Sequence, residues 1–212
     1  MAFDALRKPY LRGSLRATDL GDDPLATLRG WLAVAAEAGE AEANAMALAT
    51  VGPDGRPSVR FVLLKDVTDA GLTFFTNYGS RKAQELDASK HAALAFWWPS
   101  LERQARVEGS VERLPRDRSE AYFHTRPYGS QIGAWASRQS TVLDGRASLE
   151  ARAAELRARY PEGAVPCPPF WGGYLLRPSR FEFWQGRDDR LHDRFAVDAA
   201  DDGSWTVVRL AP

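Results

Sequence analysis

The first clear pattern along the chain is a stripe of apolar residues at helical spacing after Asp23. The stripe consists of Leu25, Leu28, Leu32, Ala35 and Ala36. Asp23 is a good N-cap, Pro24 suits the first position of a helix, and the pattern stops at Gly39. We therefore expect an amphipathic helix that begins at Pro24 and ends before Gly39.

Short apolar runs between turn residues dominate the rest of the chain and indicate strands. Turns are expected at Pro53-Asp54-Gly55, Thr68–Gly71 and Asp201-Asp202-Gly203. The expected strands are Met46–Val51, Ser58–Val67, Leu72–Asn77, Ala92–Trp98, Gln104–Arg113, Gly173–Leu176, Arg180–Gln185, Leu191–Val197 and Trp205–Leu210. Further helices are expected from the cap Ser80 through Leu86, at Arg118–His124 and at Ser148–Tyr160. The pattern predicts a mainly β fold with α-helices, an antiparallel barrel or sandwich with the helices packed outside.

Length and composition are those of an ordinary globular protein. Of the 212 residues, 44% are hydrophobic and 26% charged, so the chain can bury a core of its own. Residues 1–20 are basic and apolar without clear periodicity, and we expect them to form an arm whose order depends on what it covers. Residues 21–212 are expected to form a single domain.

Charge and motif content exclude several classes of function. Basic and acidic residues balance at 28 each, so nothing in the overall charge predicts a nucleic acid or an anionic membrane as partner. No stretch reaches the ~20 apolar residues of a membrane span, the lone Cys167 cannot form an internal disulfide, and we expect a cytoplasmic protein. Dinucleotide, P-loop and nucleophile-elbow motifs do not occur, and the three histidines are too scattered for a metal site.

The basic residues nevertheless gather in local groups that could bind anions. If residues 191–197 form a strand, Arg190, His192 and Arg194 share one face of it, which favours an anionic or electron-rich ligand over the alternative of a solvated sheet edge. Arg60 and Lys65 would face opposite sides of a regular strand, and so reach two neighbours or, through a bulge, one ligand.

Two more groups suit a phosphate. Tyr122 and Arg126 are four residues apart on an expected helix, with Ser130 just beyond, although an arginine in a last helical turn is also favoured by the helix dipole alone. Residues 79–82 would offer backbone N–H groups at a helix start beside Arg81 and Lys82, or simply form a capped surface helix.

Seven motifs spread over the chain resemble the pyridoxine/pyridoxamine 5'-phosphate oxidase family. They are R-F-V-L-L-K at 60–65, F-T-N-Y-G-S-R-K at 75–82, L-E-R-Q at 101–104, Y-F-H-T-R-P at 122–127, S-Q-I-G-A-W-A-S-R-Q-S at 130–140, F-W-G-G at 170–173 and F-W-Q-G-x-x-x-R-L-H-D-R at 183–194. The resemblance implies an FMN-binding split β-barrel with helices outside, working as a homodimer with FMN at the subunit interface. It also implies that pyridoxamine 5'-phosphate, pyridoxine 5'-phosphate and O2 are the partners of the reaction.

The same motifs imply which residues would form the site. FMN would be held by Arg60, Phe61, Val62, Leu63, Leu64, Lys65, Phe75, Thr76, Arg81, Lys82, Gln104, Gln139, Ser140, Trp184 and Arg194. The substrate would be held by Arg7, Tyr10, Lys65, Tyr122, Arg126, Ser130, Arg190, Leu191 and His192, with Arg7 and Tyr10 on an arm that closes over it. Arg190 and His192 would be the catalytic pair, no metal is implied, and Glu42 stands where the family commonly carries an aspartate.

Two other classes share many of these features. A flavin reductase on the same barrel would need no second phosphorylated ligand, so the group of Tyr122, Arg126 and Ser130 and the pair of Arg190 and His192 argue against it. A binding protein that stores or delivers pyridoxal 5'-phosphate is not excluded by any site residue.

Overall fold

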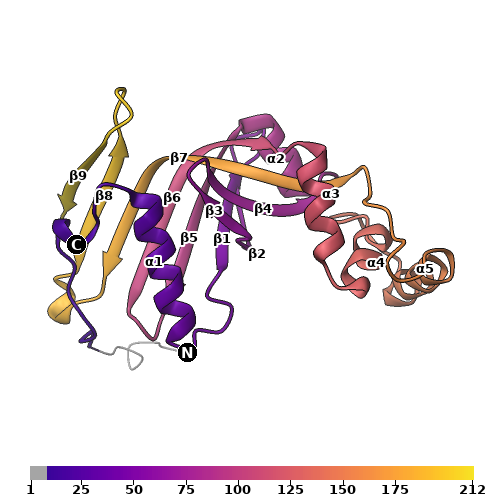
Figure 1. Ribbon diagram of the computed structural model, residues 1–212, viewed down its shortest axis with the longest axis horizontal. Coiled ribbons are helices and arrows are strands. Elements are labelled where there is room, and N and C mark those ends of the chain that lie inside the picture. The colour runs from indigo at the N-terminus through magenta and orange to yellow at the C-terminus, as the bar shows by residue number, and fades with distance from the viewer. Residues whose placement is uncertain (1–8) are drawn as a thin grey trace.

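The computed structural model describes residues 9–212 as one curled antiparallel sheet with helices around it (Figure 1). The strands are β1 Ala45–Val51, β2 Pro57–Leu63, β3 Asp66–Thr68, β4 Gly71–Asn77, β5 His91–Trp98, β6 Arg103–Arg113, β7 Trp171–Gln185, β8 Asp193–Ala199 and β9 Trp205–Leu210. The α-helices are α1 Pro24–Glu37, α2 Arg81–Ser89, α3 Arg116–Thr125, α4 Tyr128–Ala136 and α5 Arg146–Arg159, with short 3-10 turns at Ala17–Asp19 and Asp188–Arg190. None of the described helices is long and apolar enough to cross a membrane.

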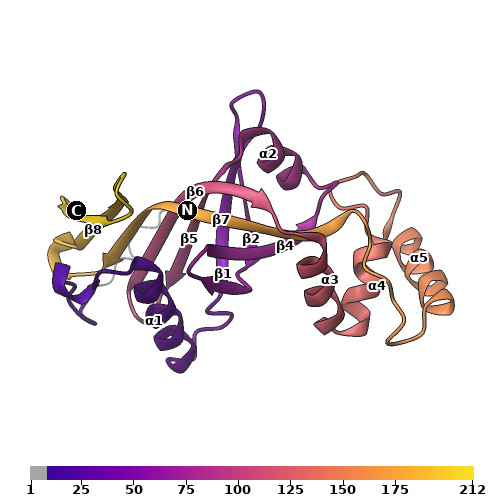
Figure 2. The same ribbon diagram turned by 45° about the horizontal axis from the view of Figure 1, so that its top comes forward.

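The sheet curls because its two ends are joined by very little chain. Its strand order is β2-β1-β5-β6-β7-β4-β3, with β8 paired to β7 and β9 paired to β8. β2 and β3 therefore lie at opposite ends of this path, although only Leu64 and Lys65 separate them in sequence. The backbone N–H of Leu64 still bonds to Asn44, whereas that of Lys65 bonds to Thr73 of β4. Lys65 thus lies where the chain passes from one end of the strand order to the other. The curl of the sheet brings β2 close to β4 (Figure 2).

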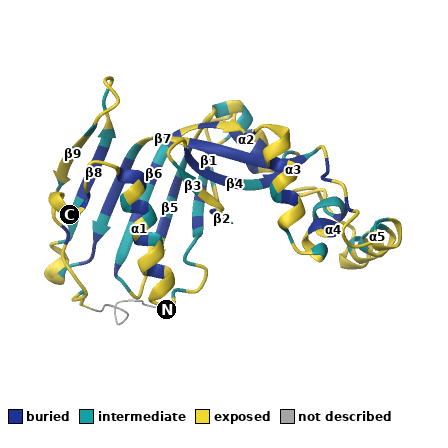
Figure 3. Ribbon diagram, in the orientation of Figure 1, coloured by how far each residue is buried: buried dark blue, intermediate teal, exposed yellow. Residues whose placement is uncertain are grey.

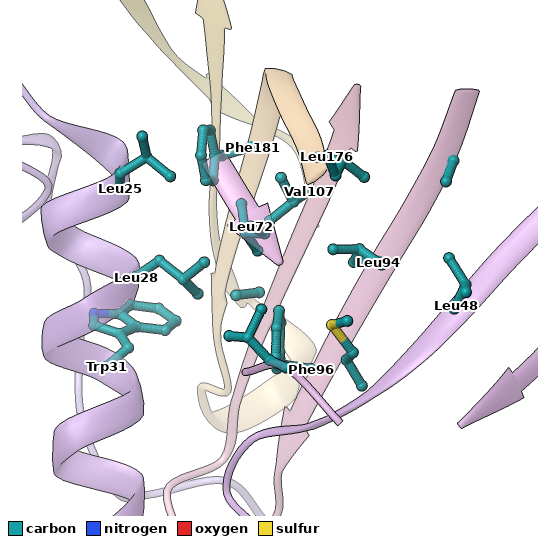
Figure 4. Close-up of a cluster of buried hydrophobic side chains, with 14 of the residues drawn as sticks. Leu25, Leu28, Trp31, Leu48, Leu72, Leu94, Phe96, Val107, Leu176 and Phe181 are labelled. Carbon is teal, nitrogen blue, oxygen red and sulfur yellow. The ribbon is translucent and has the colours of Figure 1, made fainter. Parts of the chain in front are cut away.

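One face of the sheet and helix α1 enclose the main core. The side chain of Asp23 accepts the N–H of Leu25 and Pro24 begins the helix, as predicted. Strands β5, β6 and β7 beside α1 carry many buried residues (Figure 3). Leu28 and Trp31 point from α1 toward them (Figure 4), and the Trp31 ring lies 5.1 Å from that of Phe183. Burying a large apolar side chain contributes about 1.5–3 kcal/mol, so this layer is the main source of stability.

The opposite side of the sheet, which we call the open face, carries side chains of a different kind. Alternation along β1 and β5 turns small residues such as Ala47 and Ala95 to this side, while the buried Leu48 and Leu94 face α1. Large apolar side chains on it remain accessible: Phe61 is 77% exposed, Val59 68% and Trp97 46%. In the single chain this face has much apolar surface in contact with water.

A second, smaller core lies where β7 begins, beneath α3 and α4. It is formed by Phe123, Ile132, Val165, Cys167 and Trp171. Helix α5 extends this region away from the sheet (Figure 1). Cys167 is buried there as a packing residue, in agreement with the sequence.

Several predicted elements are correct, but four predicted strands needed correction and one helix was not predicted. The segment Ser58–Val67 was predicted as one strand, but it breaks at Leu64 because the chain changes partner from β1 to β4. Gly173–Leu176 and Arg180–Gln185 were predicted as two strands and are one, β7. Pro178 is tolerated inside it because the ladder has a bulge opposite Gly109, where a Cβ would lie 2.0 Å from the Arg177 carbonyl oxygen.

The other two differences concern β8 and α4. β8 begins at Asp193, two residues later than predicted, because the pairing of Gln185 with Asp193 leaves residues 186–192 as a loop. Helix α4 was not predicted, since Gly129 and Gly133 lower its propensity, and the burial of Ile132 stabilises it instead. The division into an arm of residues 1–20 and a domain of 21–212 stays a prediction, although Leu15 and Leu20 are already part of the main core.

Candidate active site

A cavity of about 1030 Å³ runs along the edge strand β2 toward α3 and α4. It collects residues from β2, β4, α2, α3, α4 and the first residue of β7. Among the described residues that line it there are five cations and no carboxylate: Arg60, Lys65, Arg81, Lys82 and Arg126. A cavity of this composition favours ligands with several negative charges.

Three of the cations, Arg60, Arg81 and Lys82, lie together at the β2 and α2 side of the cavity, and the first two contact the buried carboxylate of Glu85. Glu85 accepts hydrogen bonds from Thr50 at 2.5 Å, Ser58 at 2.6 Å, the Arg81 Nε at 2.7 Å and the Arg60 Nη2 at 3.2 Å. Burial alone would raise its pKa, but the bonds from Ser58, Thr50 and Arg81 outweigh it and lower the pKa to about 2. Glu85 is therefore a carboxylate at any physiological pH, and it fixes both guanidinium groups.

The terminal nitrogens of Arg60 are fully engaged inside the protein. Nη1 donates to the Leu48 carbonyl at 3.0 Å and to Thr50, while Nη2 donates to Ser58 and Glu85. Arg81 is different, because only its Nε is bonded and its side chain is 63% exposed. A phosphate at this point would therefore meet the free Nη atoms of Arg81 first.

Lys82 is the buried cation of this group. Its Nζ donates to Gln139 at 2.8 Å and to Thr76 at 3.3 Å, both neutral side chains. Burial, and secondly the charge of Arg60, lower the pKa of Lys82. A phosphate here would relieve both effects, so this donor set fits the phosphate of FMN.

The backbone of the α2 start contributes less than the sequence suggested. The N–H groups of Gly79, Ser80, Arg81 and Ala83 already donate to Asn77, Ser140 or the Ser80 hydroxyl. Ser80 is thus an ordinary N-cap, as in the alternative interpretation. The anion-binding capacity comes from the side chains of Arg81 and Lys82.

A second group of polar residues that suits a phosphate lines the same cavity and contains Lys65, Tyr122, Arg126 and Ser130. The expectation that Tyr122 and Arg126 share a helix face is wrong, because α3 ends at Thr125 and Arg126 has an extended backbone. Residues before a proline avoid the helical region, and Pro127 follows. The chain turn nevertheless brings Tyr122, Arg126 and Ser130 to one cavity, as predicted. Arg60, within β2, and Lys65, after the break that follows β2, both line this single cavity.

Stacked aromatic rings connect the cavity wall to the small core. The Phe75 ring lies 3.9 Å from that of Tyr122 and 5.3 Å from that of Trp171, nearly parallel to both. A Cβ at Gly173 would lie 2.9 Å from the Phe75 ring, so only glycine leaves room for this stack. Phe75 and Thr76 line the cavity from β4, as the motifs implied.

The remaining predicted site residues lie elsewhere, at the far end of β7. Trp184 is thirteen residues beyond Trp171 on the same strand, which corresponds to roughly 40 Å of extended chain. Cross-strand pairing places Gln104, Trp184 and Arg194 in one row over three strands, and Trp97 continues that row on β5. This row and the exposed Phe61 both belong to the open face.

Arg190, Leu191 and His192 lie beside that row but not on a strand. The predicted strand face of Arg190, His192 and Arg194 is wrong, because the first of these ends a 3-10 turn with φ of 61° and the second lies in the loop before β8. His192 still packs 4.6 Å from the Trp184 ring, and its Nδ1 accepts the N–H of Arg187 at 3.1 Å. Burial, and secondly the charge of Arg190, lower the pKa of His192, which favours the neutral imidazole.

The arm residues also approach this row. The Tyr10 ring lies 5.7 Å from both Trp184 and His192, and Leu15 N–H donates to Asp193 at 3.1 Å. Arg7 lies outside the described residues. Leu64 is buried in the core and Glu42 is an exposed turn residue with φ of 52°, so neither side chain is brought to the cavity.

Two residues of the site were missed at the sequence level. Glu85 could have been found from its spacing of four residues from Arg81, which is typical of a helix ion pair. Trp171 stands in the quoted F-W-G-G motif, but its place beside Arg126 depends on how β7 meets α3, which no local pattern reveals.

Comparison with known proteins gives the same assignment over nearly the whole chain. Residues 33–160 match the profile of pyridoxamine 5'-phosphate oxidase, and residues 171–212 match that of the pyridoxine 5'-phosphate oxidase C-terminal dimerisation region. The pyridoxine/pyridoxamine 5'-phosphate oxidase of Ralstonia pickettii is 55% identical over 98% of this chain and 97% of its own length. The chain belongs to the pyridoxamine 5'-phosphate oxidase family. The same-named protein of Rubrobacter xylanophilus is 52% identical over 98% of the chain and 95% of its own length.

Solved structures support the fold. PhzG from Burkholderia lata, crystallised with tetrahydrophenazine-1-carboxylic acid, superposes with a TM-score of 0.87 at 34% identity, over 93% of this chain and 98% of its own. An FMN-binding protein related to pyridoxamine 5'-phosphate oxidase from Nostoc punctiforme gives 0.72 at 19% identity, over 87% and 97% of the two chains. The predicted family and split-barrel fold are confirmed.

Proposed function

We propose that this protein is an FMN-dependent oxidase that converts pyridoxamine 5'-phosphate and pyridoxine 5'-phosphate to pyridoxal 5'-phosphate. The observation that carries the proposal is the cavity with five cations and no carboxylate among its described lining residues. Its two polar groups, Arg81 with Lys82 and Lys65 with Arg126, suit two phosphorylated molecules at once. Family membership supports FMN as the cofactor and the vitamer phosphate as the second ligand.

Bound FMN supplies the acceptor for the hydride from the substrate C4' carbon, and O2 takes the electrons onward to give hydrogen peroxide. The protein's own residues bind and orient. Arg126 and Lys65 hold the substrate phosphate while the Tyr122 and Ser130 hydroxyls complete its hydrogen bonds. The Phe75 and Tyr122 rings exclude water from one wall.

The open face supports a homodimer with shared sites. Phe61 beside the cavity and the row of Gln104, Trp184 and Arg194 lie on the same face but far apart in one chain. In a two-fold dimer that buries this face, the Phe61 end of one copy meets the Trp184 end of the other. The match of residues 171–212 to a dimerisation region supports this arrangement. FMN would then lie at the interface, between the cavity and the partner's row.

This arrangement gives Arg190 and His192 their proposed roles. They would reach the substrate from the partner subunit, with Arg190 over the pyridine ring and the neutral His192 donating through Nε2, since its Nδ1 already accepts a hydrogen bond. Tyr10 and Arg7 would cover the substrate from the arm. Leu191 would contribute contact area only.

Anaerobic mixing with pyridoxamine 5'-phosphate tests the proposal. We expect the flavin of the purified protein to bleach without added nicotinamide and to recover its colour on admission of O2. Bleaching that requires an added reduced nicotinamide cofactor would indicate a flavin reductase. Tight binding of pyridoxal 5'-phosphate without any bleaching would indicate a carrier. Because PhzG binds a carboxylated ligand that has no phosphate, reduction by a dihydrophenazine carboxylate but not by the vitamer would reassign the substrate.

A further inference from the structure

Arg126 is held in the cavity without a counter-ion. Its side chain is half-buried, and within residues 9–212 its Nη1 is one of the few buried polar atoms with no hydrogen-bond partner. No carboxylate of the described chain lies within ion-pair distance of it. The nearest support is the Trp171 ring, whose centroid is 4.6 Å from the guanidinium carbon, with Phe123 at 5.7 Å.

Trp171 is itself fixed on several sides. It is 6% exposed, nearly parallel to Phe75 at 5.3 Å, and edge-on to Phe123 at 5.3 Å. The guanidinium of Arg116 donates to the carbonyl oxygens of Cys167 at 2.6 Å, Pro168 at 2.8 Å and Trp171 at 3.2 Å. The indole therefore offers a rigid face to Arg126.

An aromatic face and a carboxylate support an arginine in different ways. A carboxylate accepts the N–H donors and neutralises the charge, so an incoming phosphate has to compete with it. A ring holds the cation from one side through its quadrupole, and the N–H donors in the guanidinium plane stay available. Arg126 is held in the second way, which leaves its charge and its buried Nη1 for a ligand.

We infer that Trp171 is a positioning residue that holds Arg126 for the substrate phosphate and thereby sets the preference for phosphorylated over unphosphorylated pyridine ligands. The inference rests on the proposed function for the identity of the ligand. Trp171 acts through Arg126 rather than on the reacting atoms. Its effect therefore exists only while Arg126 is present and only for ligands that carry the phosphate.

The test is a double-mutant cycle on FMN-loaded protein, titrated with pyridoxal 5'-phosphate and with pyridoxal, and read by the flavin absorbance. We expect Trp171→Leu to raise the Kd of pyridoxal 5'-phosphate about 10-fold, about 1.4 kcal/mol, within the range of a partly desolvated cation–π contact. The Kd of pyridoxal should change less than about twofold. In the Arg126→Met background the same Trp171→Leu change should alter the pyridoxal 5'-phosphate Kd less than about twofold.

Two further variants separate positioning from packing. Trp171→Phe keeps a ring and should raise the Kd about threefold, again only when Arg126 is present, so the cycle stays informative if Trp171→Leu does not fold. Trp135→Leu is the matched control: Trp135 packs against the same small core and bonds to the Pro166 carbonyl at 2.7 Å, yet it does not line the cavity. It should leave both Kd values unchanged.

Equal effects of Trp171→Leu with and without Arg126, or on both ligands, would overturn the inference, because packing alone would then explain them. A wild-type protein that does not oxidise pyridoxamine 5'-phosphate would contradict the proposed function instead. The coupling between Trp171 and Arg126 can also be measured without relying on the proposed function. The measurement is the rise in thermal midpoint that inorganic phosphate produces in wild type, Trp171→Leu, Arg126→Met and the double variant. The inference is supported if phosphate no longer raises the thermal midpoint of Trp171→Leu and the double variant shows no further loss of this rise. It is overturned if the losses in the two single variants add up in the double variant.

Discussion

Arg60 and Arg126 line one cavity but are held in opposite ways. Arg60 bonds through both terminal nitrogens to Leu48, Thr50, Ser58 and the buried Glu85, and its charge is balanced inside the protein. Arg126 rests on the Trp171 ring and keeps an unpaired buried nitrogen. The first setting stabilises the fold before any ligand arrives, and the second keeps its binding capacity for the ligand.

The difference separates two tasks that a binding site must perform. Around Glu85, Arg60, Arg81 and Lys82 would repel one another without a counter-charge, so the carboxylate makes the site stable when it is empty. Arg126 instead lies over the Trp171 ring and forms no ion pair among the described residues, so an aromatic face is its main support. A resident cofactor and a substrate that must come and go are suited to these two settings respectively.

Replacing Arg126 with methionine should have the largest effect on ligand binding. The change keeps much of the apolar stem but removes the charge and the two parallel hydrogen bonds to the substrate phosphate. We therefore expect the KM of pyridoxamine 5'-phosphate to rise about 100-fold, which corresponds to about 2.7 kcal/mol. FMN content should not change, because Arg126 lies with the other polar group. The KM of Arg126→Lys should lie between those of wild type and Arg126→Met, since an ammonium keeps the charge but cannot make two parallel bonds.

Steady-state kinetics and the flavin-to-protein ratio check this prediction. Arg118→Met is a suitable control, because Arg118 is an exposed residue of helix α3, which ends just before Arg126, and it does not line the cavity. An unchanged KM in Arg126→Met would show that the arginine merely caps the helix end, and would remove the basis of the comparison.

Replacing Glu85 with glutamine should have the next largest effect, and on stability rather than on binding. The amide keeps one acceptor oxygen for four donors, so at least one guanidinium loses its partner. We expect the FMN-free protein to lose roughly 2 kcal/mol, less than the 3–5 of a fully buried broken pair because Arg81 can return to water. FMN affinity should be unchanged or higher, since the phosphate then supplies the missing negative charge.

Urea unfolding of the FMN-free protein, together with the FMN dissociation constant, tests this claim. Glu112→Gln is the control, because Glu112 pairs with Arg177 on the surface and such pairs contribute at most about 1 kcal/mol. If Glu85→Gln instead weakens FMN binding tenfold at unchanged stability, the carboxylate orients the phosphate ligands, and the contrast with Trp171 disappears.

The sequence could predict the elements of this fold but not how they close. Asp23, Pro24 and the stripe around Leu28 identify α1 because capping and periodicity are local properties. The break after Leu63 is not local, since it exists because Lys65 finds a partner in Thr73 on another strand. Elements that are determined by local sequence signals were therefore predicted correctly, whereas strand ends that depend on a change of pairing strand were not.

The same holds for the site. Arg81, Lys82 and Thr76 were selected from motifs and line the cavity. The strand face assumed for Arg190 and His192 failed because a 3-10 turn replaces the start of the strand, a consequence of the register between Gln185 and Asp193. That Trp184 lies far from Arg81 in one chain follows only from the length of β7, and it is this distance that makes the second subunit necessary to the proposal.

The smallest effect should be a pH dependence confined to the Glu85 setting. In the unfolded chain a glutamate titrates at about pH 4.3, whereas the folded protein holds the pKa of Glu85 at about 2. A carboxylate with a lowered folded pKa contributes stability that is complete above the unfolded value and disappears as the pH falls toward the folded one. The difference in unfolding free energy between wild type and Glu85→Gln should therefore be constant above about pH 5 and should narrow between about pH 4 and 2. Urea unfolding of both FMN-free proteins across this pH range measures this difference. The difference in unfolding free energy between wild type and Trp171→Leu serves as the comparison, because neither tryptophan nor leucine titrates. A Glu85 difference as flat as that of Trp171 would mean that the carboxylate stabilises this side of the cavity by shape and not by charge.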